Sequence, residues 1–365
     1  MKKSESPAVI PVQRGIQISF NCLDPGSRAH KPSLQFIIFS VYRLWCLATN
    51  NAGFIRTFGI LILLSVLSVS SVAGAGEALP GKWEIRALMP SARTEVAAVE
   101  LGGKIYVMGG YGKNGDLVEE YDPAKNSWRG RASLPRPLHH IGAAAVGGKI
   151  YVIGGYSSGQ GSIDTVYEYD ASADRWRTRS PMPTARGALA VGVIDGKIYA
   201  VGGVGPNGKN TDANEAYDPA QDRWIKRNAI PTSRDHHAIG VVNGKLYAIG
   251  GRINGRHDRS ITDNEEYDPA IDRWRSRAPM PTVRSGIVAA SLNGQIFVFG
   301  GESSFGTHNQ TESYDPVKNS WHRWAPMPTA RHGLGAAVIG HSIYVVSGGP
   351  KPGATYSAAN EVFTP

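Results

Sequence analysis

The sequence predicts an all-β protein with the architecture of a six-bladed β-propeller. A Gly-Gly pair that ends an apolar segment recurs six times, 45 to 50 residues apart. A fixed internal period of this length is typical of propellers and other repeat architectures. One tryptophan accompanies each unit. The pairs begin at Gly109, Gly154, Gly202, Gly250, Gly300 and Gly348, and the tryptophans are Trp83, Trp128, Trp176, Trp224, Trp274 and Trp321.

Each repeat contains four short segments of strand character, which are clearest in the third copy. Residues 186–203 (RGALAVGVIDGKIYAVGG) contain a strand of small residues, an Asp-Gly turn and an apolar strand that ends at the glycines. Asp-Gly between two such runs is a strong hairpin signal. A variable loop follows, then a strand that ends in Tyr-Asp-Pro (217–219) and a strand that begins at Trp224. Four antiparallel strands per repeat make one propeller blade.

The arrangement of the repeats predicts how the ring closes. Trp83 stands before the first diglycine, and the sixth copy stops at Pro365 after its third strand. The missing outer strand of the last blade is therefore expected to come from the N-terminal strand, residues 81–87. A ring closed in this way leaves no unpaired strand edge at the joint.

The diglycine after an apolar strand, the tyrosine of the third strand and the tryptophan of the fourth, at this spacing, resemble the kelch repeat. The resemblance extends over residues 81–365, so we expect residues 76–365 to form one kelch-type propeller. The resemblance implies the fold and leaves the function open, because kelch propellers include both enzymes and binding modules.

Residues 1–75 have the pattern of an export leader. The apolar run 58–72 is shorter than the ~20 residues that span a bilayer. It follows Arg56, and residues 73–75 (Ala-Gly-Ala) fit a signal-peptidase site. We therefore expect a bacterial-type kelch protein that is exported to the periplasm or secreted. If the leader is not cleaved, residues 58–72 would anchor the protein to the inner membrane.

Composition excludes several classes of function. The net charge is +9, but residues 1–75 contain seven Lys/Arg and two Asp/Glu, which leaves +4 for the propeller. This charge is too small to indicate nucleic-acid binding. Both cysteines, Cys22 and Cys46, precede the propeller, so disulfides and thiolate chemistry are excluded there. The tyrosine–cysteine group of galactose oxidase, a copper enzyme on a kelch-like propeller, is excluded as well. We expect no cofactor and a monomer.

The two ends of the propeller differ in their loops. Two-residue turns such as 195–196 and 243–244 join the first and second strands, and short Asp-Pro turns join the third and fourth. The loops after the diglycines differ in length and composition, and we call the end that carries them the loop face. Variation gathered on one face of a repeat protein is typical of a ligand face. Neutral variation of solvated loops is the alternative.

Five repeats carry an arginine at the start of the innermost strand and a glutamate two residues before the aromatic residue of the third strand. The second repeat has lost both, with Leu138 and Tyr167 in their places. Joint loss is expected of buried ion pairs, because removing one partner costs ~3–5 kcal/mol. The resemblance to kelch adaptors of ubiquitin ligases implies a ligand-binding role for the same arginines. The residues are Arg93, Arg186, Arg234, Arg284 and Arg331, with Glu119, Glu215, Glu265, Glu312 and Glu361.

The positions directly after the arginines differ between repeats, and several are polar. Polar side chains are costly in strands that otherwise contain Gly, Ala and Val unless something satisfies them. We therefore expect these positions to contact the ligand. Histidines from alternate blades converge on the axis, but no HxH or HExxH spacing accompanies them, so no metal site is predicted. The candidates are Glu95, His139, His140, Asp235, His236 and His332.

Two functions follow from these observations. The first is an exported, non-catalytic module that captures a protein segment or a glycan on the loop face. The alternative is a carbohydrate-active enzyme that resembles the bacterial sialic acid mutarotases, which are exported kelch propellers. Such an enzyme needs an acid/base residue in the axial pocket, and Glu95, Asp235 and His236 are the candidates.

Overall fold

The computed structural model describes residues 78–112 and 115–365. The predicted leader (1–75), with its apolar core 58–72, lies outside the described residues. Within the described part every regular element is a β-strand, as the sequence predicts. A search of the same residues for a helix long and apolar enough to cross a membrane finds none.

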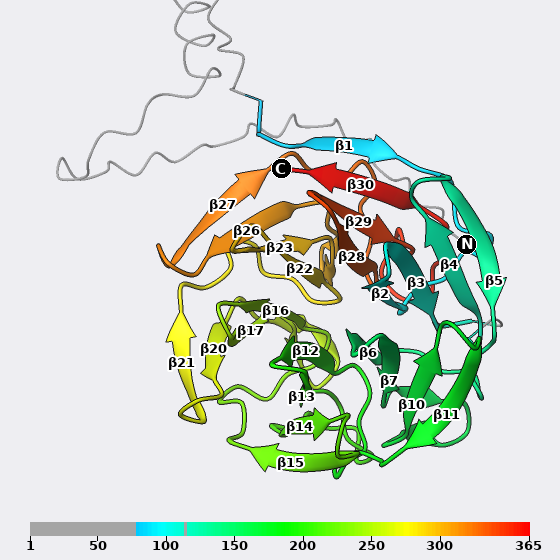
Figure 1. Ribbon diagram of the computed structural model, residues 1–365. Coiled ribbons are helices and arrows are strands. Elements are labelled where there is room, and N and C mark those ends of the chain that lie inside the picture. Colours follow the sequence, from blue (N-terminus) through cyan, green and yellow to red (C-terminus); the bar gives the residue numbers. More distant parts are fainter. Residues whose placement is uncertain (1–77, 113–114) are drawn as a thin grey trace, which may run out of the picture. The chain divides into compact units, whose positions relative to one another are not determined.

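Six four-stranded antiparallel sheets form the blades, arranged around a central axis (Figure 1). From the axis outward, the first blade contains β2 (Ala97–Leu101), β3 (Lys104–Met108), β4 (Val118–Asp122) and β5 (Ser127–Arg131). The second blade contains β6 (Gly142–Val146), β7 (Lys149–Ile153), β10 (Val166–Asp170) and β11 (Arg175–Arg179). The third blade contains β12 (Ala190–Ile194), β13 (Lys197–Val201), β14 (Asn214–Asp218) and β15 (Arg223–Arg227).

The remaining blades repeat this order, and short hairpins extend three of the variable loops. The fourth blade contains β16 (Ala238–Val242), β17 (Lys245–Ile249), β20 (Asn264–Asp268) and β21 (Arg273–Arg277). The fifth blade contains β22 (Val288–Leu292), β23 (Gln295–Phe299), β26 (Thr311–Asp315) and β27 (Ser320–Trp324). The sixth blade contains β28 (Gly335–Ile339), β29 (Ser342–Val346), β30 (Asn360–Thr364) and β1 (Lys82–Ile85). The hairpins are β8 (Tyr156–Ser157) with β9 (Gly161–Ser162), β18 (Arg252–Ile253) with β19 (Arg256–Ser260), and β24 (Glu302–Ser303) with β25 (Gly306–Thr307).

The ring closes where the sequence predicts. Strand β1 pairs with β30 in antiparallel register, with Trp83 opposite Phe363. The indole N–H of Trp83 donates to the carbonyl of Ala325, in the link after β27 (2.9 Å). The other five tryptophans that mark the repeats make the same bond to the link of the preceding blade. The joint between the chain ends is therefore held like the other contacts between blades.

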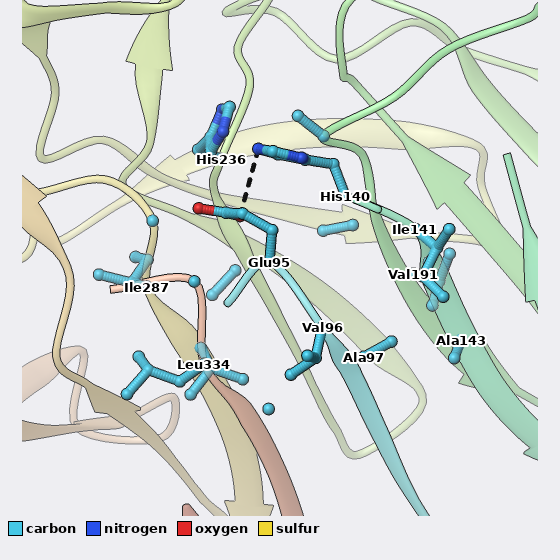
Figure 2. A pocket seen from close by; sticks show the side chains of 18 of the residues that line it. Glu95, Val96, Ala97, His140, Ile141, Ala143, Val191, His236, Ile287 and Leu334 are labelled. Carbon is cyan, nitrogen blue, oxygen red and sulfur yellow. Dashed lines mark ion pairs between the residues drawn. The ribbon is translucent and has the colours of Figure 1, made fainter. Parts of the chain in front are cut away.

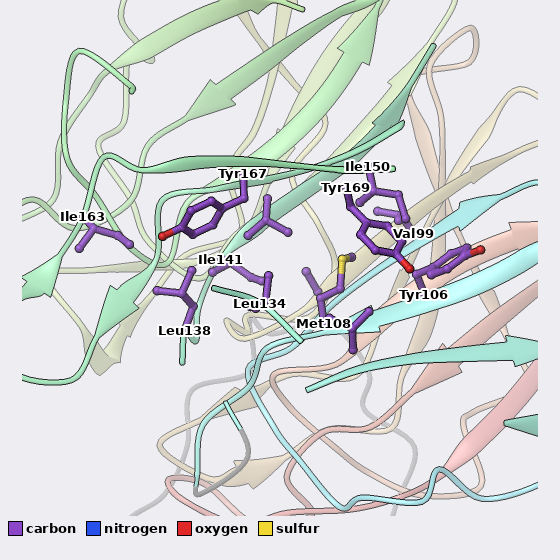
Figure 3. Packing of buried hydrophobic residues seen from close by; sticks show 13 residues of the cluster. Val99, Tyr106, Met108, Leu134, Leu138, Ile141, Ile150, Ile163, Tyr167 and Tyr169 are labelled. Atoms are coloured by element: carbon purple, nitrogen blue, oxygen red, sulfur yellow. The ribbon is translucent and has the colours of Figure 1, made fainter. Parts of the chain in front are cut away.

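The core lies between neighbouring blades. The second strand of each blade is buried along nearly its whole length, as in β3 and β7, and its side chains pack against both adjacent blades. Figure 3 shows the contact of the first two blades, where Met108 and Tyr106 meet Tyr169 and Ile150. The innermost strands carry small residues because six of them must converge on the axis.

The diglycines are explained by contacts between blades. The N–H of Gly155 donates to the carbonyl of Arg186 in the next blade (2.9 Å), and a Cβ on Gly154 would lie 2.5 Å from that same oxygen. Both glycines have positive φ. A side chain at either position would be strained and would push the two blades apart.

The buried ion pairs expected from the sequence are present in all five repeats. Each arginine lies 2.7 to 3.0 Å from its glutamate, and all five arginines are at most 1% exposed. A hydroxyl two residues before the arginine binds the same carboxylate, as Thr184 does with Glu215 (2.7 Å). In the second blade Leu138 and Tyr167 instead join the apolar cluster of Figure 3.

The second blade supplies a template for testing one pair. Arg186→Leu alone is expected to lower the free energy of unfolding by ~3–5 kcal/mol, because it leaves the Glu215 carboxylate buried without its partner. The double substitution Arg186→Leu, Glu215→Tyr reproduces the residues of the second blade and should recover most of this loss. Urea unfolding of the two single variants and the double variant measures the coupling. Strictly additive losses would contradict the paired role.

Candidate functional site

A closed ring of six backbone hydrogen bonds surrounds the axis on the loop face. In each blade, the second residue after the arginine position donates its N–H to the carbonyl of the equivalent residue in the preceding blade, at 2.8 to 3.1 Å. All six residues have left-handed backbone, with φ between 52° and 62°. We call this the axial ring; its members are Glu95, His140, Ala188, His236, Gly286 and Gly333.

The axial ring carries side chains that its backbone disfavours. A left-handed conformation costs a residue other than glycine ~1–2 kcal/mol, and two blades avoid this cost with Gly286 and Gly333. Three blades instead carry Glu95, His140 and His236. Glycine at these three positions would relieve the backbone strain, as it does in two other blades. The retention of large side chains there therefore indicates that they have a function.

Below the ring lies an axial cavity of about 180 Å³. The first four residues of each blade from the ring inward line it, and most of these residues are apolar, with Ile141, Val191, Ile287 and Leu334 among them (Figure 2). The polar groups therefore gather at the mouth. A polar mouth above an apolar wall is typical of small-ligand sites.

The residues one position before the ring form a second tier. Five of them pair with the residue that follows a diglycine in an antiparallel bridge, as His139 does with Tyr156 and Asp235 with Arg252. The sixth, His332, pairs with the second glycine of the last diglycine, Gly349. This tier brings the start of the variable loops to the mouth. The six bridges are Thr94 with Tyr111, His139 with Tyr156, Gly187 with Val204, Asp235 with Arg252, Ser285 with Glu302, and His332 with Gly349.

Glu95 lies at the centre of the polar cluster. One carboxylate oxygen is 3.3 Å from Nε2 of His140 (Figure 2), and the other is 3.2 Å from Nδ1 of His332. Burial alone would raise the pKa of Glu95, but the histidines around it hold this pKa below its usual range. A Cβ on Gly333 would lie 2.6 Å from the Glu95 carboxylate, so the glycine of one blade leaves space for the glutamate of the next.

The four histidines at the mouth lie in different environments. Burial lowers the pKa of His140 to about 3, against the opposing charge of Glu95, and its Nδ1 lies 2.5 Å from Nδ1 of His139. Burial would lower the pKa of His332 as well, but Glu95 and Glu302 outweigh burial and raise it. The Nε2 of His332 faces the carbonyls of Lys351 and Gly353. These surroundings favour a neutral His140, whereas the carboxylates beside His332 shift its pKa in favour of the charged form.

His236 connects the ring to a buried charge network. Its Nδ1 contacts the carboxylate of Asp235 (2.5 Å), and its Nε2 lies 2.9 Å from a guanidinium nitrogen of Arg252. Arg252 also binds Asp235 (3.2 Å) and Glu302 (2.7 Å). Burial would raise the pKa of Asp235, but the contact with His236 leads in lowering it to about 2.

The structure brings together the six polar candidates named from the sequence, namely Glu95, His139, His140, Asp235, His236 and His332. It places Arg93, Arg186, Arg234, Arg284 and Arg331 in the buried pairs, away from the cavity wall. These five arginines therefore do not line the cavity in this structure, and their predicted role in ligand binding stays a prediction. Sequence reasoning missed Arg252, Glu302 and Tyr156. Their signal is their position directly after a diglycine, where the strand order places them beside the candidates.

Comparisons with known proteins agree with this fold. A family model for the Kelch-repeats domain of KLHDC2, KLHL20 and DRC7 matches residues 95–279 and 228–363. The solved structure of YjhT is similar with a TM-score of 0.68 at 17% sequence identity, covering 77% of this chain and 97% of that chain. At this identity the similarity supports the fold alone. No curated protein matches the sequence.

Glycine substitutions two residues apart test the strain in the axial ring. Ala188→Gly is expected to raise the free energy of unfolding by up to ~1 kcal/mol, because relief of ~1–2 kcal/mol of left-handed strain exceeds the entropic cost of glycine. Ala190→Gly, in β12, should lower it by ~0.5–1 kcal/mol. Urea unfolding of both variants measures the difference. The same sign for both would argue against strain in the ring.

Proposed function

The chain belongs to the kelch-repeat family, and from this premise we propose that it is an exported binding propeller. In this proposal it captures a protein segment or a glycan at the mouth of the axial cavity, on the loop face. Kelch propellers generally bind proteins, which favours a protein segment. The proposal of export rests on the predicted leader, residues 1–75. A cleaved leader would give a periplasmic or secreted protein, and an uncleaved leader would anchor the protein to the inner membrane through residues 58–72.

The distribution of residues in the axial ring carries the proposal. The six blades share their diglycines, tryptophans and hydrogen bonds, yet they differ at the ring and in the tier that precedes it. Three of the six ring positions hold strained polar residues in place of glycine. Structural needs alone would favour the same small residue in all six blades.

Exposed aromatic residues on the loop face support capture of a protein segment. Phe305, between the strands β24 and β25, is 96% exposed. Tyr111 is 42% exposed, and its ring stands perpendicular to that of His139 with centroids 4.8 Å apart. An exposed aromatic side chain beside a polar mouth, such as Tyr111, is a typical anchor of protein interfaces.

A carbohydrate-active enzyme is the second candidate, and one observation favours it. The Glu95 carboxylate stands between two imidazole groups at the mouth, a combination found where protons are transferred. Of the other acid/base candidates, Asp235 is fully buried and bound by His236 and Arg252. Direct proton transfer to a ligand is therefore better assigned to Glu95 or His236 than to Asp235.

Binding to peptide libraries and to an array of glycans and sugar acids tests the leading proposal on the full chain. For a ligand found in this way, Tyr111→Ala is expected to weaken binding at least tenfold, because it removes an exposed anchor at the mouth. Ile271→Ala is the matched control. Ile271 is also an exposed apolar residue, but it lies in a turn between the third and fourth strands, at the opposite end. Equal losses for the two variants would contradict binding at the loop face.

The enzyme hypothesis has a separate test. Each sugar that binds is followed by NMR for exchange between its anomers, with the wild-type chain and with Glu95→Gln. Catalysed exchange that disappears in Glu95→Gln would replace the binding-module proposal with an enzyme. Binding without catalysed exchange is the outcome that we expect.

A further inference from the structure

We propose that Glu95, His140 and His236 bind one divalent transition-metal ion, of the Zn²⁺ type, in the axial ring. The sequence spacing indicates no metal, because the three residues lie in three different repeats. The proposal does not depend on the identity of the ligand at the loop face. It rests on the convergence of the three donors, on the groups that hold them, and on their backbone.

The donor atoms of the three side chains converge. One atom from each residue lies within 4.8 Å of the other two. The Glu95 oxygen and Nε2 of His140 are 3.3 Å apart, which matches the separation of two ligands about 2.0–2.1 Å from a tetrahedral zinc ion. His236 needs a small movement to complete the set. Its ring already packs against that of His140, with centroids 4.9 Å apart.

Each donor is held by a second group, as metal ligands commonly are. Nδ1 of His236 contacts the carboxylate of Asp235 (2.5 Å), so Nε2, which now contacts Arg252, is the atom that would bind the ion. Nδ1 of His140 contacts His139 (2.5 Å), and the second oxygen of Glu95 faces His332 (3.2 Å). A histidine that donates its other ring N–H to a carboxylate is characteristic of metal sites, because the contact fixes the tautomer and the ring orientation.

The backbone provides an independent observation. The three donors are the three large side chains of the axial ring, each on left-handed backbone. The other ring positions hold alanine or glycine. The strained positions and the converging donors are therefore the same residues. A metal ion would account for both features.

Arg252 is the group that must move when an ion binds. Its guanidinium contacts Nε2 of His236 (2.9 Å), which is the atom that the ion would take. Two carboxylates, Asp235 and Glu302, also hold it. It can therefore give up the His236 contact and keep both charge partners, which limits its repulsion of the ion.

The donor set selects the class of metal. Two imidazoles and one carboxylate suit Zn²⁺ and its neighbours in the first transition row, whereas Mg²⁺ and Ca²⁺ prefer oxygen ligands. Three protein ligands leave one position open, as in catalytic zinc sites. An ion in the ring would present this open position to a polar group of a ligand at the mouth.

Metal titration of the full, tag-free chain tests the proposal. Chelator-treated protein with Cys22→Ser and Cys46→Ser is titrated with ZnCl₂ by calorimetry and with CoCl₂ by visible absorption. We expect one ion per chain and a cobalt spectrum of four-coordinate nitrogen and oxygen ligands. The serine substitutions exclude thiolates of the leader as the binding groups. Less than one ion per folded chain would overturn the proposal.

Glycine variants separate loss of the site from loss of the fold. Glu95→Gly and His236→Gly replace strained residues with the residue that this backbone prefers, so circular dichroism should show folded protein. We expect metal affinity at least tenfold lower in each variant. His341→Asn, at an exposed histidine in the turn after β28, should leave the affinity unchanged. Unchanged affinity in both glycine variants would overturn the proposal.

Discussion

The fold depends on the contacts of the residue at which each innermost strand begins, which is an arginine in five of the six blades. In the third blade the side chain of Arg186 enters its own blade and binds Glu215 together with the carbonyls of Ala200 and Ala213. The carbonyl of the same residue accepts the N–H of Gly155 from the neighbouring blade. One residue thus organises the interior of a blade and joins it to the next. The charges are tolerated in the core because every guanidinium has a carboxylate and several carbonyls around it.

This contact also determines where the site can form. The two residues after the arginine lie at the mouth, and their backbone positions are fixed by the bridge to the start of the variable loop and by the axial ring. Their side chains are therefore presented by a rigid frame, which is what a precise polar site requires. The second blade shows that the frame tolerates change. Leu138 keeps the carbonyl contact to Gly110 although the ion pair is gone, and His139 and His140 still reach the mouth.

The sequence alone predicts the fold and the polar residues that follow the arginine positions, but it does not predict the residues that the variable loops add to the site. The repeat period and the diglycines predict the blades, because these features recur and each has a local physical cause. The position of Trp83 before the first diglycine predicts that β1 closes the ring. The polar residues after the arginines stand out for the opposite reason, because they differ between repeats in strands that otherwise contain small apolar residues. The arginines were ambiguous, since one position could face either a glutamate or the cavity. Arg252 and Glu302 were missed because their partners lie in a different strand, and their proximity follows from register.

Only three of the six ring positions carry polar side chains, and repulsion between like charges explains why all six do not. Six identical charged side chains around an axis would face one another at short range, and their repulsion would destabilise the ring. Mixing a carboxylate, imidazoles and glycines avoids this. Gly333 leaves room for Glu95, and Gly187 leaves room for the ring of Tyr156. A repeat protein thus builds an asymmetric site by pairing each large residue with a small one in the neighbouring blade, while the hydrogen bonds that hold the ring stay the same.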